Sequence, residues 1–238
     1  MIDLSHPIHT GMTVYPGDPG VRCTQSLSLE ADGAEVMAVS LGSHTGTHID
    51  APSHSIEGGR SINEVTLGEL VGDALVLHLA DRVGPGTRID AAMLEAELDQ
   101  FVAVPRIVLL HTGWDRHFNT DLAFDHPFLD RDAAEALWQR GMRVLGVDTL
   151  SPDRTAADVA GGGAGLGLGK EAAPGVFPVH DVVLGGDGLI VENLCGLERL
   201  ATLAKVGFFP LPLTGDGAPV RAVAWAPGSR DAPVGGAL

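Results

Sequence analysis

Short apolar runs of the buried-strand type recur along the chain, and they limit its fold more than any other feature. Runs of four to eight apolar residues bounded by turn residues are typical of strands that are covered on both faces. Near the N-terminus, two further runs rich in strand-forming residues flank the turn at residues 31–33. The predicted strands are residues 21–30, 35–41, 74–79, 106–111, 144–148 and 188–191.

Two helices are marked by capping residues. Asp90 is predicted to cap a helix that ends near Gln100, and Asp130 or Asp132 a second helix that Gly141 closes. Strands come first and helices then alternate with strands, without a strict β–α–β rhythm or an internal repeat. The length of 238 residues fits one domain, residues 1–238, of the mixed α/β class.

Composition argues against several classes of function. Acidic residues outnumber basic ones by 31 to 15, and the net charge of −16 disfavours nucleic acid or an anionic membrane surface as a partner. No apolar stretch reaches the about 18 residues of a transmembrane helix, and the N-terminus lacks a signal-peptide pattern. Cys23 and Cys195 form no CxxC pair, so two buried thiols are a simpler interpretation than a disulfide. We expect a soluble, cytoplasmic protein with a small-molecule substrate.

A glycine-rich segment, residues 160–169, precedes Lys170 and resembles a phosphate-binding loop at first sight. A P-loop would need Gly at position 164 and Ser or Thr at position 171, where this chain has Ala164 and Glu171. No capped helix follows immediately to direct its dipole at a phosphate. We therefore expect a mobile surface loop, with an active-site lid as the alternative.

One segment carries most of the chemistry, because His44, His48, Asp50 and His54 all fall on even positions. An extended chain has a side-chain period of two, so these four side chains are predicted to project from one face. Gly46 lies on the same face and leaves space between the first two rings. A helix is disfavoured here by that glycine, by β-branched neighbours and by a proline.

Two imidazoles and a carboxylate are the common ligand set of a catalytic divalent metal with an open position for water. Such a metal lowers the pKa of water towards about 7 and polarises a carbonyl, while a further group shuttles protons. His54 stands apart from the other three residues and is the candidate for that shuttle. A single histidine would be interpreted as an ordinary polar loop residue, but three with an aspartate on one face indicate a metal-dependent hydrolase.

The pattern H-x-G-T-H-x-D-x-P-x-H at residues 44–54 resembles the signature of the cyclase family of metal-dependent hydrolases, which includes bacterial kynurenine formamidases and isatin hydrolases. The resemblance implies a compact α/β fold with a barrel-like mixed sheet flanked by helices, assembled as a homodimer or homotetramer. It also implies that His44, His48 and Asp50 hold a first metal and that His54 is the catalytic acid and base. Weaker similarities follow in the family's order at residues 3–8, 14–18, 111–114, 146–153, 210–213 and 217–224.

In the formamidase branch a histidine and a glutamate farther along the chain complete a two-metal site, with the aspartate bridging. The matching residues here are His180 and Glu192. Glu192 also stands out by itself, because it follows the apolar run 189–191, where an isolated carboxylate would be costly unless paired or bound to metal. Imidazole ligands suit Zn and added carboxylates suit Mn, so we expect one or two ions of either metal per chain.

Two departures from the family pattern bear on the substrate. Tyr15 stands where kynurenine formamidases typically carry a tryptophan that lines the substrate pocket, and it keeps an aromatic platform while adding a hydroxyl. The spacing between Asp153 and His180 is long and holds the glycine-rich segment. We expect Tyr15 to contact the substrate.

The remaining histidines are predicted to be structural. His78, inside an apolar strand, would be a hydrogen-bonded core residue, whereas His9, His117 and His126 would lie at the surface or in turns. Asp148 follows a strand and is expected to cap a neighbouring turn.

These features predict hydrolysis of a small amide or formamide, as in an arylformamidase, or of a lactam or lactone. One alternative is an isatin-type lactam or lactone hydrolase that uses a single metal. A second, from another class, is a catalytically silent binding protein that contains a metal. His54 argues against the binding protein, because a structural metal site needs no proton shuttle. A nucleotide-binding protein is disfavoured by the missing P-loop residues.

Overall fold

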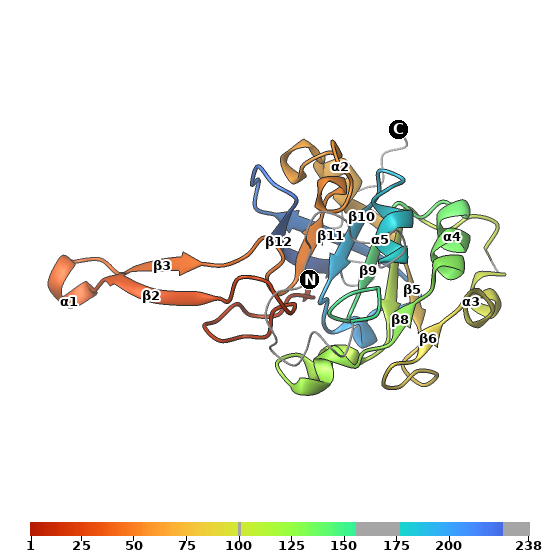
Figure 1. Cartoon of the computed structure of the whole chain (residues 1–238), viewed down its shortest axis with the longest axis horizontal. Coiled ribbons are helices and arrows are strands. Elements are labelled where there is room, and N and C mark those ends of the chain that lie inside the picture. The colour runs from red at the N-terminus through yellow and green to blue at the C-terminus, as the bar shows by residue number, and fades with distance from the viewer. Residues whose placement is uncertain (100, 156–176, 226–238) are drawn as a thin grey trace.

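Seven strands close into a barrel because β12 pairs with β11 along one edge and with β4 along the other (Figure 1). The structure is a computed structural model that describes residues 1–99, 101–155 and 177–225. A short strand, β1 (Ile2–Asp3), also pairs with the end of β12. The barrel strands are β4 (His48–Asp50), β5 (Val71–His78), β7 (Ile107–His111), β9 (Val144–Val147), β10 (Leu189–Glu192), β11 (Leu203–Pro210) and β12 (Gly217–Trp225). Four of them, β5, β7, β9 and β10, lie where strands were predicted, at residues 74–79, 106–111, 144–148 and 188–191.

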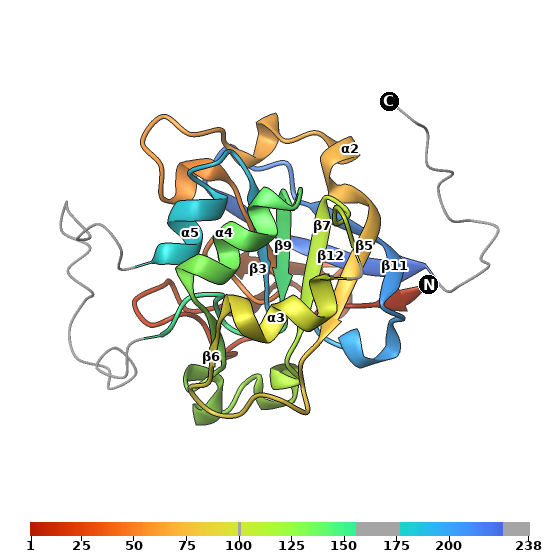
Figure 2. The same ribbon diagram turned by 90° about the vertical axis from the view of Figure 1, so that its right-hand side faces the viewer.

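The middle of the barrel is parallel, since β5, β7, β9 and β10 run side by side in the same direction. The chain crosses between them through α3 (Ala91–Leu98), α4 (Arg131–Gln139) and α5 (Pro178–Val183), which cover one side of the barrel (Figure 2). The sequence showed no strict β–α–β rhythm, because the connections also contain a separate strand pair, β6 (Arg88–Ile89) with β8 (Phe128–Leu129). The structure nevertheless has this rhythm in its parallel half.

Both capped helices form where they were expected. The Asp90 side chain accepts a hydrogen bond from the Met93 amide, and the Asp130 side chain accepts one from the Ala133 amide, both at 2.9 Å. Asp130, rather than Asp132, is therefore the cap of α4. Apart from the short helix α1 (Leu29–Asp32), the remaining helices of the described residues are one-turn elements at connections: α2 (Leu67–Leu70), η1 (Pro52–His54), η2 (Ile62–Glu64), η3 (Trp114–His117), η4 (Asp121–Phe124) and η5 (Leu197–Arg199).

Alternating strand residues divide the hydrophobic core in two. The barrel interior contains residues from all of its strands, including Ile49, Val191 and Phe208. Their neighbours in sequence pack outward against the helices, as Ile190 does. A polar residue adjacent to an interior residue on β4 or β10 consequently faces outward.

The expected strands around residues 31–33 form a hairpin that projects away from the barrel (Figure 1). It consists of β2 (Arg22–Leu27), a one-turn helix α1 (Leu29–Asp32) and β3 (Val36–Ser40). Cys23 on this hairpin and Cys195 are both free thiols and only half-buried, which corrects the expectation that they are buried. Within the described residues no helix is long and apolar enough to cross a membrane. The glycine-rich segment 160–169 lies outside them.

Two histidines away from the metal-ligand candidates differ from expectation. His126 is buried and not at the surface, because its ring nitrogens pair with the Pro127 carbonyl and the Thr155 hydroxyl, both at 2.8 Å. His78 is hydrogen-bonded as expected, with its Nδ1 2.9 Å from that of His111. It is nevertheless exposed, since it is the last residue of β5.

Candidate metal centre and active site

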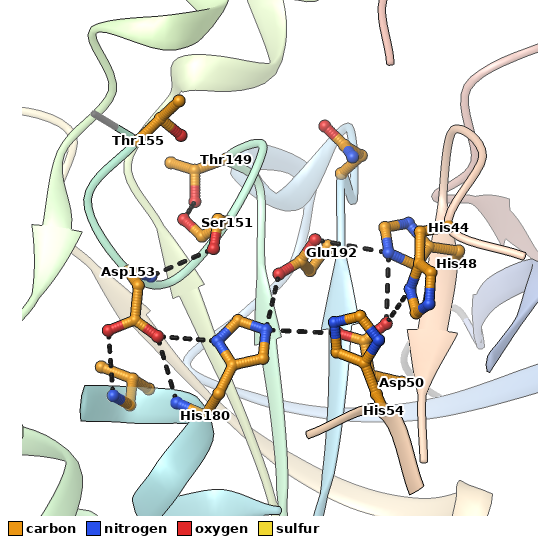
Figure 3. Close-up of polar contacts among 12 residues, drawn as sticks. His44, His48, Asp50, His54, Thr149, Ser151, Asp153, Thr155, His180 and Glu192 are labelled. Atoms are coloured by element: carbon orange, nitrogen blue, oxygen red, sulfur yellow. Dashed lines mark hydrogen bonds and ion pairs between the residues drawn. The ribbon is translucent and has the colours of Figure 1, made fainter. Parts of the chain in front are cut away.

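Two adjacent strands, β4 and β10, place three polar side chains together. His48 and Glu192 are directly opposite each other in the antiparallel ladder, and Asp50 lies two residues farther along β4. Because Ile49 and Val191 point into the barrel, these three side chains point outward, towards α5 (Figure 3). All three are buried.

The histidine-rich segment is not extended throughout, so the prediction of one shared face is wrong for the run as a whole. Gly46 has a φ of 62°, which turns the chain after His44, and only His48 to Asp50 form a strand. His54 ends the 3₁₀ helix η1. These turns still bring the residues together: His44 Nδ1 lies 2.6 Å from Asp50 Oδ1, and the His44 and His54 ring centroids are 4.0 Å apart.

His180 reaches the same place from the first turn of α5. Asp153 fixes it, accepting hydrogen bonds from the Val179 and His180 amides and, at 2.7 Å, from His180 Nδ1. The other ring nitrogen, Nε2, then faces Asp50 Oδ2 at 3.7 Å and Glu192 Oε1 at 3.6 Å (Figure 3). Asp153 therefore orients a candidate ligand from behind, as a hydrogen-bonding partner of a metal-bound histidine does.

The hydrogen bonds of His48 assign its protons. Its Nδ1 lies 2.8 Å from the Gly46 carbonyl, which can only accept, so Nδ1 carries the hydrogen. Its Nε2 lone pair faces Asp50 Oδ1 and Glu192 Oε2, each at 3.3 Å. His48 Nε2 and Asp50 Oδ2 are buried without a hydrogen-bond partner. A ring lone pair that faces carboxylates in a buried space is unfavourable unless a proton or a metal cation lies between them.

Three groups of possible metal ligands lie in the described residues; one of them, His44 with His54 and Asp216, is partly exposed, and the other two surround the buried space. His44, His48 and Asp50 form one set, and Asp50, His180 and Glu192 form the other; within each set the ligand atoms lie within 4.8 Å of one another. The two sets share Asp50. Imidazole nitrogens combined with carboxylate oxygens suit divalent transition metals, so the residues present fit one or two such ions.

Without a metal, the imidazole rings that face these carboxylates are protonated. Burial opposes protonation of His44, but the carboxylates of Asp50 and Asp216 outweigh it and raise the pKa of His44 to about 9. The same balance, with Asp153, Asp50 and Glu192 as the anionic partners, raises the pKa of His180 to about 10. These protons hold positions that a divalent cation would take.

Asp216, which the sequence did not single out, lies in the loop before β12. Its Oδ2 is 2.9 Å from His44 Nε2 and 3.3 Å from His54 Nδ1, so one oxygen accepts from both rings. These hydrogen bonds hold the pKa of Asp216 well below its usual range. The one local signal is the following Gly217, where a Cβ would lie 2.7 Å from the Ile49 carbonyl oxygen and 2.9 Å from His44 Cε1.

Tyr15 borders the same site. Burial and the negative charges of Glu192, Asp153 and Asp18 raise its pKa to about 12, although a hydrogen bond with Thr155 works in the opposite direction. Tyr15 is therefore a neutral, half-buried phenol beside the candidate ligand Glu192. This position agrees with the expectation that Tyr15 lines the substrate pocket, and its role stays a prediction.

Comparison with known proteins agrees with this geometry. Residues 2–154 match the family model Cyclase. The kynurenine formamidase of Geobacillus thermodenitrificans is 29% identical over 227 residues, which cover 93% of this chain and 95% of that protein. Isatin hydrolase A from Ralstonia solanacearum superposes with a TM-score of 0.80 at 22% identity, over 94% of this chain and 90% of that one. A structure described as a predicted metal-dependent hydrolase from Bacillus stearothermophilus gives a TM-score of 0.70 at 27% identity, and the match covers 93% of this chain and 96% of that one.

The barrel, its two sets of imidazole and carboxylate donors and these relatives define a metal-dependent hydrolase. The chain belongs to the cyclase family. Both the kynurenine formamidase and the isatin hydrolase relatives are hydrolases that act on amide C–N bonds. The family resemblance, the α/β barrel fold and the enzyme class expected from the sequence are thereby confirmed.

Proposed function

We propose that the protein hydrolyses a small formamide, as an arylformamidase does, with water activated at a two-metal site. The sharing of Asp50 between the two donor sets supports this most directly, because a bridging carboxylate is what a pair of adjacent cations needs. The likeness to a kynurenine formamidase over 93% of the chain supports the substrate class. The single-metal lactam hydrolase and the silent binding protein are not favoured.

Divalent cations bound there would lower the pKa of water towards about 7 and polarise the substrate carbonyl. The protein itself would contribute by holding the ring nitrogens of three histidines in fixed directions towards the cations. The outer nitrogens of His44, His48 and His180 are each paired with an oxygen acceptor, so the inner nitrogens face the carboxylates of Asp50 and Glu192, where a cation would be held.

His54 is proposed as the proton shuttle. Its Nδ1 hydrogen is held by Asp216, which leaves Nε2 to accept a proton from water and return it to the leaving nitrogen. Its side chain is 33% exposed, so the ring borders the open side of the site where a substrate would enter. His44, by contrast, is 12% exposed and takes the role of a ligand.

Tyr15 is proposed to hold the aromatic part of the substrate. A neutral phenol offers a flat apolar face with a polar edge, which suits an aryl formamide. For the metal we propose Zn or Mn, because the combined sets contain three imidazoles and two carboxylates. We propose a homodimer or homotetramer as the assembly.

A hydrolysis panel tests the proposal. The purified protein is treated with chelator, dialysed, reloaded with Zn or Mn and assayed with N-formylkynurenine, isatin, a simple lactone and a carbamate. We expect chelator to abolish hydrolysis, either metal to restore it, and N-formylkynurenine to be the preferred substrate. Hydrolysis of none of the four by any metal-loaded form would contradict the proposal.

A further inference from the structure

His44, His54 and Asp216 form the partly exposed group of possible metal ligands; we call it the outer group. Its ligand atoms lie within 4.8 Å of one another, with the two rings next to each other (Figure 3). His44 Nε2 is 2.9 Å and His54 Nδ1 is 3.3 Å from the same oxygen, Asp216 Oδ2. Ligand atoms of one tetrahedral zinc ion, each about 2.0–2.2 Å from the metal, are separated by about 3.4 Å. Small movements of these side chains would therefore let the outer group hold an ion.

The outer group differs from the two buried sets in its exposure to solvent. The side chains of His54 and Asp216 are 33% and 42% exposed, whereas those of His48 and Asp50 are 3% and 1% exposed. Three protein ligands also leave a position open for water. An ion in the outer group would therefore exchange with solvent more readily than an ion in the buried sets, and dialysis against metal-free buffer would remove it.

His44 contributes a different nitrogen to the outer group than to the buried set. Its Nδ1 faces Asp50 at 2.6 Å, and its Nε2 faces Asp216. An ion on Nε2 takes the place of the hydrogen that this nitrogen donates to Asp216. If Nδ1 already binds a metal, the ring must release that hydrogen to solvent as a proton, because neither nitrogen can then carry it. This required loss of a proton makes binding to the outer group weaker than binding to the buried sets.

His54 would lose its proposed task if its Nδ1 held an ion. Without an ion there, Nδ1 donates its hydrogen to Asp216 and Nε2 is free to accept a proton from water. A neutral imidazole has one N–H, so with an ion on Nδ1 the hydrogen must lie on Nε2. That nitrogen can then donate a hydrogen bond but cannot accept a proton, and the ring no longer serves as a general base.

We propose that a further divalent zinc ion binds to His44, His54 and Asp216 when the metal is in excess, and that it inhibits the enzyme. Two imidazoles and one carboxylate favour Zn over Mn, because imidazole suits Zn and the affinity of such donors is lowest for Mn along the first-row series. The net charge of −16 also increases the local concentration of cations. The inhibition rests on the proposed function, whereas the binding of the ion does not.

The binding test is equilibrium dialysis of the wild type, His54→Ala and His9→Ala against a series of free zinc concentrations, from those that fill the buried sets to a large excess. We expect His54→Ala to bind as many ions as the wild type at low zinc and one ion per chain fewer in excess zinc. His9→Ala lacks an exposed histidine outside the outer group and should match the wild type throughout. Equal zinc binding by the wild type and His54→Ala over the whole series would overturn the proposal.

Kinetic measurements test the inhibition. As zinc fills the outer group, kcat of the wild type for N-formylkynurenine should fall by about 10²–10⁴-fold, the usual contribution of a general base. Its midpoint should match that of the additional ion in dialysis, and the Mn-loaded enzyme should keep its kcat in the same excess of Mn. Binding of the additional ion without a fall in kcat would refute the inhibition.

The two measurements also separate this inference from the proposed function. Absence of hydrolysis in every metal-loaded protein would refute the proposed function, whereas dialysis would still decide whether the outer group binds an ion.

Discussion

At the scale of single residues, Asp216 connects the two chemical tasks of the site. One carboxylate oxygen accepts from a candidate metal ligand, His44, and from the candidate proton shuttle, His54. Such partners fix which ring nitrogen carries the hydrogen and raise the basicity of the other. Asp153 does the same for His180. The two aspartates explain how three imidazoles can be aimed at one buried space.

Replacement of Asp216 by Asn should therefore weaken both tasks. An amide keeps the shape but loses the charge, and loss of such a partner typically reduces metal affinity or activity by about 10–100-fold. Metal affinity is measured by competition with a chromophoric chelator, alongside kcat and KM. Asp121→Asn, at an exposed position on η4, serves as the control. Equal metal affinity and equal kcat in the two variants would rule out this role.

His54→Ala tests the proton shuttle. General acid–base groups contribute about 10²–10⁴-fold to rate, so kcat for the formamide should fall by that factor. Metal content, measured by elemental analysis, should not change. His9→Ala removes an exposed histidine from the same half of the chain and should leave kcat unaltered. A His54→Ala enzyme with the parent kcat would refute the assignment.

The pKa values of His44 and His180 predict how pH acts on the metal-free protein. Both are raised in the folded state, to about 9 and about 10, from an ordinary value of 6.5. Their contribution to stability is complete below pH 6.5 and is lost as pH rises through 9 to 10. A metal binds the deprotonated rings, so its affinity for the site increases as the rings lose their protons. The difference in Tm between metal-loaded and chelated protein should widen across this range; a constant difference would contradict the assignment.

At the scale of elements, the sequence predicts what is local and misses what is brought together by folding. The apolar runs locate β5, β7, β9 and β10, and aspartate caps locate α3 and α4, because both signals lie within a few residues. The signature at 44–54 predicts the candidate ligands, although the turn at Gly46 replaces the expected extended face. Glu192 stands out after its apolar run, but its partnership with His180 required a family resemblance, since 12 positions and a helix-to-strand turn separate the two.

The roles of Asp153 and Asp216 were not predicted, because their hydrogen-bonding partners are distant in sequence. The two strands of the hairpin were predicted, but its projection from the barrel was not. The residues of β3 favour a strand, yet all of them are exposed. A pattern of side chains predicts a strand without indicating what covers it.

The start of β12 gives an element-scale prediction. Gly217→Ala would place a methyl group 2.7 Å from the Ile49 carbonyl oxygen, where β12 meets β4, and should destabilise the fold by about 1–3 kcal/mol. Gly215→Ala, two residues away, meets nothing within 4 Å and is the matched control. Chemical denaturation measures both. Equal free energies of unfolding would mean that barrel closure tolerates a side chain there.

At the scale of the whole molecule, barrel closure assembles the site from four separate parts of the chain. These parts meet because β4 pairs with both β10 and β12. They are the segment with His44 and Asp50, the strand end with Glu192, the helix with His180 and the loop with Asp216. Acidic groups concentrate there in a protein of net charge −16. Cations bound at this junction would therefore hold the closing strands together as well as activate water.

The stoichiometry of bound metal in the wild type and in Glu192→Gln is the most direct test of the two-metal account. Glu192 belongs only to the second donor set, so its amide variant should lose one of two ions per chain by elemental analysis. The same sample should lose most of its N-formylkynurenine hydrolysis, whereas Glu95→Gln, exposed on α3, should match the wild type in both measurements. Unchanged metal content and unchanged hydrolysis in Glu192→Gln would contradict the two-metal site.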